Sequence, residues 1–332
     1  MQKSNTGRDV RLDNVKGVLI LLVVFGHVLE LFLAKSALYR AIYSGIYIFH
    51  IPLFVMIAGM LSKATLQATD FEKIITRLLL PLIIFQILYV GFIGLKSSHP
   101  AVPLLQPYWI LWFLLSMIFW RLALPLFVRV PFFLAISFAI ALAAGFSKSI
   151  AYTLSLSRTL YFFPFFLIGY SHGKRIIAFA VAHRHLLALI FLLIFAGVGW
   201  WSLIGLPHNA LYGSLGYAAV PVIKTAPAVG RALVLVLSFA CAAGALALFY
   251  FPRELLINLG RRSLTVFVLH GFAVMGLSAL VNRLHIEPSA LLLPALLGIS
   301  LSIAVAASLF DPWLNRLYEA IGSRFRLHGN IA

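Results

Sequence analysis

The sequence has little charge, few acidic residues and a single cysteine. Only 11% of its 332 residues are charged, with nine Asp and Glu against 26 Lys and Arg. The lone Cys241 excludes an intrachain disulfide. No Pro-, Gly- or Ser-rich linker of useful length is present, and no segment of soluble character exceeds about 25 residues. These absences exclude a disulfide-stapled fold and a chain of several soluble domains.

Long apolar runs fill the chain instead. Hydrophobic residues make up 62% of it, and runs close to the length of a bilayer crossing recur from end to end. At about 1.5 Å per residue, a helix needs roughly 20 residues to cross an apolar core about 30 Å thick. The expected fold is an all-α, polytopic membrane bundle of about ten transmembrane helices. The predicted spans are 16–34, 43–62, 74–95, 107–127, 131–147, 158–173, 186–205, 230–250, 264–281 and 289–309.

We expect one membrane-embedded domain over residues 1–332, with short tails and no appended soluble domain. The first apolar run is too long for a cleaved signal peptide and lacks a small-residue cleavage site behind it. This run should therefore remain as a membrane helix.

The basic residues are distributed unevenly along the predicted topology. With the N-terminus in the cytoplasm, 18 Lys and Arg lie on the cytoplasmic side and eight on the outer side. This asymmetry follows the positive-inside rule, so both termini are predicted to be cytoplasmic. Orientation thus explains the net charge of +17, and we expect membrane lipids rather than nucleic acid around the protein.

Two ionisable residues, His27 and Glu30, lie in the apolar run of the first span, from Val18 to Leu33. An imidazole deep in an apolar run is costly unless it has a partner or a task, so His27 is a candidate catalytic residue. Glu30 follows three residues later on the same helical face, which suits a base and its orienting carboxylate. The alternatives are a His that is satisfied inside the bundle and a Glu that marks the outer interface.

Four basic residues near the cytoplasmic ends of spans are candidates for binding an anionic cofactor: Arg11, Lys16, Lys73 and Arg77. Arg11 lies about 24 Å from His27 along a helix axis, so the two cannot share one catalytic contact. Lys73 and Arg77 are one turn apart on one face, where they either bind phosphates or extend toward lipid headgroups. Arg11 and Lys16 have the alternative role of topology determinants.

Three further residues are candidates for binding the substrate. His50 stands beside Pro52 in FHIPLFVMIAG, where a proline kink would open space for a polar ligand. Arg158 is expected at the outer edge, where its guanidinium can clamp a hydroxylated or anionic acceptor, and His270 is buried in the ninth span. Each also has a purely structural reading. The aromatic run PYWILWF at 107–113 is interpreted as an interfacial belt rather than a pocket wall.

These motifs resemble, in their order, the acyltransferase 3 family, and most closely its fucose 4-O-acetylase and related acetyltransferase branch. The resemblance covers about residues 8 to 310 and rests on Arg11 with His27, FHIPLFVMIAG, the pair Lys73 and Arg77, RTLYFFPFFLIGY and LGRRSLTVFVLH. It implies an enzyme of the bacterial cytoplasmic membrane that takes acetyl from acetyl-CoA. It also implies an acceptor hydroxyl on a cell-surface or exported polysaccharide, or on its lipid-linked precursor, and partners in polysaccharide biosynthesis or export.

The chemistry that the residues suggest agrees with acetyl transfer from acetyl-CoA to a sugar hydroxyl. Phosphates of cytoplasmic acetyl-CoA match the basic inner residues, and His27 is placed to act as a general base or as a covalent acyl carrier. General base is the first hypothesis. The rival is a proton-coupled transporter or glycan-lipid translocase, in which the buried His and Glu residues relay protons. No metal is expected, because His27, His50 and His270 include no close-spaced pair of ligands.

Overall fold

The structure is a computed structural model that describes residues 9–94, 106–147, 150 and 152–323. These described residues form helices and turns, without a β-strand among them. The α-helices in chain order are α1 (Val10–Glu30), α2 (Ala37–Tyr47), α3 (His50–Met60), α4 (Ala68–Ile74), α5 (Leu80–Gly94), α6 (Trp112–Phe127), α7 (Phe133–Ala143), α8 (Leu156–Ala182), α9 (Arg184–Ile204), α10 (Pro227–Phe249), α11 (Glu254–Arg261), α12 (Ser263–Arg283), α13 (Leu293–Ser308) and α14 (Asp311–Gly322).

Short segments of tighter or wider helix join these elements. A π-helical turn, η1, connects α4 to α5. The other five segments are 3-10 turns. Their bounds are η1 (Ile75–Leu79), η2 (Trp109–Leu111), η3 (Ala144–Phe146), η4 (Thr153–Ser155), η5 (His208–Tyr212) and η6 (Ala290–Leu292).

Each predicted span falls on helical structure, the second on two consecutive helices, which confirms the all-α, polytopic membrane bundle. Eight helical stretches in the described chain have the length and hydropathy of a membrane crossing. A shorter apolar helix, Phe133–Phe146, falls on the fifth predicted span. The sixth falls on α8, which is 27 residues long and is not among the eight. The number of ten crossings therefore remains a prediction.

The second span is broken in a place other than the expected one. A kink at Pro52 is the prediction, but the helix breaks at Ile48 and Phe49, between α2 and α3. Pro52 instead lies in the first turn of α3, where its missing N–H removes no helical hydrogen bond. His50 bridges the break, because its Nδ1 donates to the carbonyl oxygen of Ile46 at 2.9 Å.

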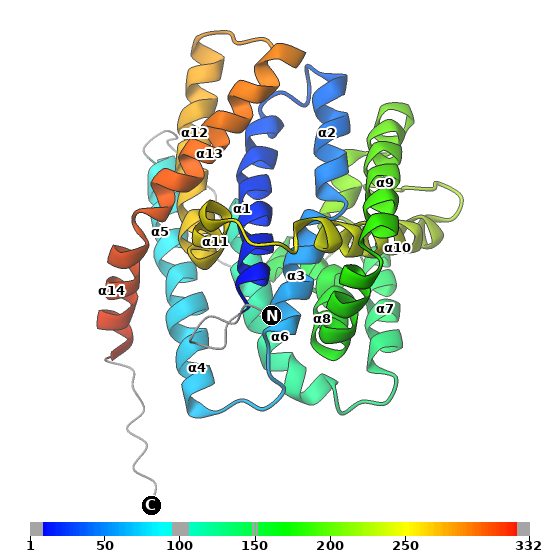
Figure 1. The fold of residues 1–332 in the computed structure, drawn as a ribbon, viewed down its shortest axis with the longest axis vertical. Coiled ribbons are helices and arrows are strands. Elements are labelled where there is room, and N and C mark those ends of the chain that lie inside the picture. Colours follow the sequence, from blue (N-terminus) through cyan, green and yellow to red (C-terminus); the bar gives the residue numbers. More distant parts are fainter. Residues whose placement is uncertain (1–8, 95–105, 148–149, 151, 324–332) are drawn as a thin grey trace, which may run out of the picture.

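The first helix occupies the middle of the bundle. In Figure 1, α1 (blue) runs between α2 on one side and α12 and α13 on the other, and it packs against all three. The short α11 lies across its N-terminal half. Residues on every face of α1 are buried, because neighbouring helices surround it. This agrees with the even distribution of apolar residues around the helix. This position places His27 and Glu30 inside the bundle.

Small residues bring α3 and α8 into close contact. A Cβ at Gly59 would overlap the carbonyl oxygen of Phe166, and one at Gly169 would overlap that of Met56. Glycine at both positions therefore allows the two backbones to touch, which is the usual way in which membrane helices associate tightly. This contact anchors α3, the helix that begins at His50.

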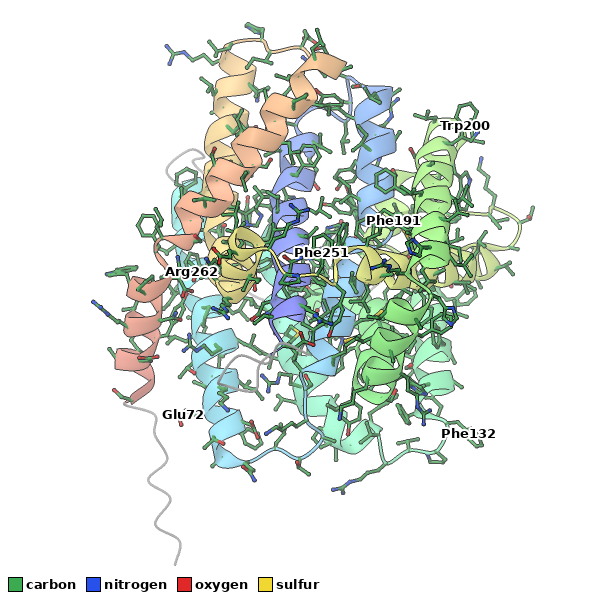
Figure 2. All side chains as sticks on the ribbon, in the orientation of Figure 1. Glu72, Phe132, Phe191, Trp200, Phe251 and Arg262 are labelled. Atoms are coloured by element: carbon green, nitrogen blue, oxygen red, sulfur yellow. The ribbon has the colours of Figure 1, made fainter. Side chains whose placement is uncertain are left out.

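Large apolar side chains cover much of the outer surface. Trp200 on α9 and Phe132 before α7 are strongly exposed and lie at opposite ends of the molecule (Figure 2). Others point outward along the helices between these ends, including Ile87, Leu126 and Leu193. An apolar surface of this extent is expected of a bundle in lipid.

Candidate active site

His27 and Glu30 line a cavity of about 570 Å³. We call it the histidine cavity. Its wall combines residues from α1, the α2–α3 break, the η2–α6 segment, the start of α8 and η5. It is lined by Val23, His27, Glu30, Tyr47, His50, Ile51, Gln106, Pro107, Tyr108, Trp109, Ile110, Trp112, Tyr152, Ser155, Arg158, Phe162, Leu211, Tyr212 and Phe267.

The two α1 residues are directly bonded. Nδ1 of His27 lies 2.9 Å from Oε2 of Glu30. Because a carboxylate only accepts, Nδ1 carries the hydrogen, and the lone pair of the neutral ring is left on Nε2. This is the tautomer that a general base requires, with a carboxylate holding the opposite nitrogen. The predicted pair of base and orienting carboxylate therefore exists as a contact, while its catalytic role stays a prediction.

Aromatic rings fix the imidazole of His27 from two sides. The ring of Trp109 meets it edge-on with centroids 4.7 Å apart, and the ring of His270 stacks on it at 5.4 Å. His270 is fully buried, and its Nδ1 donates to the carbonyl oxygen of Val266 at 3.1 Å. Its Nε2 has no hydrogen-bond partner in the described part of the chain. His270 thus supports the base from behind and does not itself line the cavity.

Of the other predicted substrate residues, His50 and Arg158 both line the histidine cavity. Arg158 lies in the first turn of α8, and its guanidinium carbon is 5.0 Å from the ring centre of Trp112 and 5.7 Å from that of Tyr152. Its Nε is buried without a hydrogen-bond partner among the described residues. A guanidinium close to two aromatic rings, with an unused donor, is suited to bind an oxygen-rich group.

The aromatic run at 107–113 contributes to the cavity and not only to the membrane interface. Tyr108, Trp109 and Trp112 all line it. The interpretation of the run as an interfacial belt rather than a pocket wall therefore does not account for these three side chains. The reason is tertiary: η2 turns inward over the end of α1, so the rings that a linear sequence places at a span end are brought over His27.

A second, more apolar cavity of about 280 Å³ adjoins the first. Val23, Ile51 and Phe267 line both cavities, so these three side chains form the boundary between them. Three cations, Lys16, Arg77 and Arg121, line the second cavity, which we call the arginine cavity. The two cavities therefore adjoin at apolar side chains, with the cations lining one cavity and His27 lining the other.

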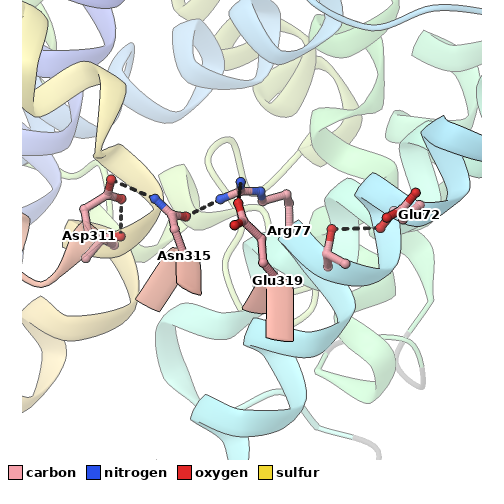
Figure 3. A network of polar contacts seen from close by, with 7 residues as sticks. Glu72, Arg77, Asp311, Asn315 and Glu319 are labelled. Atoms are coloured by element: carbon pink, nitrogen blue, oxygen red, sulfur yellow. Dashed lines mark hydrogen bonds and ion pairs between the residues drawn. The ribbon is translucent and has the colours of Figure 1, made fainter. Parts of the chain in front are cut away.

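Two of the four predicted cofactor residues line the arginine cavity. Lys16 does so while it pairs with Asp13 at 2.8 Å. Arg77, on η1, contacts Asn315 and lies 3.4 Å from a carboxylate oxygen of Glu319, both on α14 (Figure 3). Asn315 in turn donates to Asp311 at 2.9 Å, which ties this network to the start of α14.

The other two predicted cofactor residues line neither cavity. Arg11 lies over the ring of Tyr250, 5.5 Å from its centre. Lys73 is 63% exposed and lies 4.0 Å from a carboxylate oxygen of Asp70. Lys73 lies in α4, and Arg77 lies in the π-helical turn η1 that follows it.

Sequence reasoning missed several residues of the site. Arg121 is one of the 18 basic residues assigned to the cytoplasmic side and has no other role in the sequence analysis. A lone Arg within an apolar span is nevertheless a signal of function. Tyr43 and Tyr47 were not considered, although they are four apart in α2 and directly precede His50. Their hydroxyls donate to Oε1 of Glu30 at 2.5 and 3.0 Å.

Comparison with known proteins places this site in a family. The sequence profile described as an acyltransferase domain matches residues 9–310. The Nodulation protein NolL of Sinorhizobium fredii (strain NBRC 101917 / NGR234) is 32% identical over 126 residues, which are 33% of this chain and 34% of that protein. The Nodulation protein NolL of Mesorhizobium japonicum (strain LMG 29417 / CECT 9101 / MAFF 303099) is 38% identical over 69 residues, 20% and 18% of the two chains. The chain thus matches about a third or less of either curated relative, and no solved structure matches it. Because the profile covers nearly all of the described bundle, including the surroundings of His27, the chain belongs to the acyltransferase 3 family.

Proposed function

We propose that this acyltransferase moves an acetyl group from acetyl-CoA to a sugar hydroxyl of a cell-surface or exported polysaccharide, or of its lipid-linked precursor. The observation that carries the proposal is the position of His27 and its partner Glu30 next to two adjoining cavities of opposite character. One cavity is apolar and ends in cations, and the other is lined by aromatic rings and Arg158.

The arginine cavity fits the donor. Arg77, Arg121 and Lys16 are cations that can pair with the phosphates of the nucleotide, and the apolar walls beyond them suit a pantetheine arm. Lys16 and His27 are both on α1, about 16 Å apart along its axis, a distance that the extended arm can span. The positive-inside assignment puts these cations on the cytoplasmic side, with both termini in the cytoplasm of a bacterial inner membrane.

The histidine cavity fits the acceptor. Sugar rings present apolar faces and many hydroxyls, and the cavity offers the indoles of Trp109 and Trp112, the guanidinium donors of Arg158 and the ring of His50, whose Nε2 can accept a hydrogen bond. Arg158 has a buried Nε that no described residue uses, so binding an oxygen there costs no existing bond.

The reaction balances with His27 alone as the proton carrier. Nε2 takes the proton from the acceptor hydroxyl as that oxygen attacks the thioester carbonyl. The tetrahedral intermediate collapses, the carbon–sulfur bond breaks, and the proton returns from the imidazolium to the thiolate, leaving CoA as a thiol. Glu30 keeps the ring oriented and stabilises its positive charge. An acyl group carried on His27 itself is the second mechanism.

Labelled acetyl-CoA mixed with membranes that contain the protein tests this proposal. Time-dependent label on saccharide supports the enzyme. Accumulation of an unmodified glycan in sealed vesicles, without acylation, would instead favour the proton-coupled transporter or glycan-lipid translocase. Analysis of acyl groups on exported polysaccharide, with and without the protein, identifies the acceptor; partners in polysaccharide biosynthesis or export remain part of the proposal.

A further inference from the structure

Two tyrosines share one oxygen of the Glu30 carboxylate. Tyr43 donates to Oε1 at 2.5 Å and Tyr47 donates to the same atom at 3.0 Å. Their rings are stacked with centroids 3.9 Å apart. The other oxygen, Oε2, accepts from His27. Both ends of the carboxylate are therefore occupied, and its plane cannot rotate without breaking a bond to a tyrosine or to the histidine.

The local sequence explains how the tyrosines reach this carboxylate. They are four residues apart and so lie on one face of α2, in the turns just before the helix breaks. Gly26 precedes His27 on α1, and a Cβ at this position would lie 3.0 Å from the ring of Tyr47. The missing side chain leaves room for the tyrosine ring beside the histidine.

The carboxylate needs these donors because of where it lies. Glu30 is the last residue of α1, and the partial negative charge of a helix C-terminus disfavours a carboxylate there. It is also largely removed from water, with 26% of its side chain exposed. Hydrogen bonds from two hydroxyls and an imidazole compensate for the lost hydration of the charge.

A third tyrosine extends the cluster toward the connection between α9 and α10. The hydroxyl oxygens of Tyr43 and Tyr212 are 2.6 Å apart. Because Tyr43 gives its hydrogen to Glu30, Tyr212 is the donor in this contact. Burial and the nearby Glu30 charge raise the pKa of Tyr212, so its hydroxyl keeps the proton that it donates.

We infer that Tyr43 and Tyr47 are positioning residues for acyl transfer, which hold Glu30 so that it fixes the ring of His27 with Nε2 available as the base. The inference rests on the proposed function. Neither tyrosine transfers a proton in the reaction, and each acts only through the Glu30 carboxylate. Tyr212 supports Tyr43 in turn and has a smaller effect.

Tyr39 provides a matched control on the same helix. Tyr39 and Tyr43 are both fully buried, and the Tyr39 hydroxyl also donates, to the carbonyl oxygen of Ser289 at 3.0 Å. Tyr43→Phe and Tyr47→Phe are expected to lower the maximal rate of acetyl transfer in membranes about tenfold or more, with an unchanged apparent KM for acetyl-CoA. Tyr39→Phe loses an equivalent hydrogen bond and should retain the rate within about twofold.

A double-mutant cycle distinguishes positioning from a general structural role. If Tyr43 acts through Glu30, the variant Glu30→Gln with Tyr43→Phe should be no slower than Glu30→Gln alone, within about twofold. The inference would be overturned if the double variant lost rate by the product of the two single-variant losses. It would also be overturned if Tyr43→Phe had the same rate as Tyr39→Phe. Thermal stability in detergent is measured for every variant. If Tyr43→Phe does not fold, the same double-mutant cycle is carried out with Tyr47→Phe and Glu30→Gln.

Absence of acetyl transfer by the unmodified protein would instead count against the proposed function.

Discussion

Arg77 and Glu319 form an ion pair, 3.4 Å apart, across the contact between η1 and α14 at the arginine cavity. Asn315 binds the same guanidinium one turn earlier on α14 (Figure 3). The C-terminal helix therefore supplies the partners of one cation proposed to bind the donor. A phosphate that binds Arg77 has to compete with these partners or join them.

Replacing Glu319 by Gln is expected to strengthen donor binding. The variant removes a competing charge from Arg77 while keeping the size of the side chain. Because the pair is exposed and such pairs contribute about 0–1 kcal/mol, the apparent KM for acetyl-CoA should fall by about two- to fivefold. Initial rates at varied acetyl-CoA measure this. An increased KM would mean that Glu319 helps to position Arg77 for the donor.

Replacing Arg77 by Ala is expected to weaken donor binding, with Lys73→Ala as the matched control. Loss of a phosphate-binding guanidinium should raise the apparent KM for acetyl-CoA about tenfold or more. Lys73 is exposed and lines neither cavity, so its removal should change KM by less than about twofold. Equal effects of the two substitutions would contradict the assignment of the arginine cavity to the donor.

Replacing His27 by Gln is expected to abolish acetyl transfer without unfolding the bundle. Glutamine can still contact Glu30 but cannot accept a proton, and loss of a general base lowers rates about 10²- to 10⁴-fold. Labelled acetyl on saccharide gives the rate, and the yield of folded protein in detergent gives the control. Activity equal to that of the unmodified protein would remove His27 from the mechanism.

Replacing Arg158 by Gln is expected to affect the acceptor and not the donor. Arg158 lines the histidine cavity with a buried Nε that no described residue uses, whereas the cations Lys16, Arg77 and Arg121 line the arginine cavity. The rate at low acceptor concentration should fall about tenfold or more, while the apparent KM for acetyl-CoA stays unchanged. Arg158→Lys retains the charge but loses the guanidinium that lies 5.0 Å from the ring centre of Trp112, and it should recover only part of the rate. A change in donor KM alone would refute this assignment.

Replacing Gly59 by Leu is expected to destabilise the bundle. The added side chain would meet the backbone of Phe166 on α8, which cannot move aside as a side chain does. Gly197→Leu is the control, because nothing lies near its Cβ direction. Thermal unfolding in detergent should show a lower midpoint or no folded protein for Gly59→Leu alone. Similar midpoints for the two variants would show that α3 and α8 can separate at no cost.

The histidine–glutamate pair illustrates how far the sequence leads. Their spacing of three residues within an apolar span predicted a common helical face, and α1 brings the two side chains into contact. The tyrosines that complete this cluster come from α2 and η5, and no local spacing connects them with Glu30. Likewise, the one-turn spacing of Lys73 and Arg77 does not distinguish them, yet only Arg77 lines a cavity.

Composition and periodicity by themselves determined that the chain is a helical membrane bundle, because long apolar runs are stable in lipid only as helices that satisfy their own backbone. They also determined that the imidazole of His27 in the first span needed a partner. Glu30, three residues later on the same helical face, is that partner. Only the tertiary structure decided which aromatic rings and cations share a cavity with that imidazole. Those choices depend on how helices distant in sequence pack against one another, and that packing is set by shape complementarity over the whole bundle.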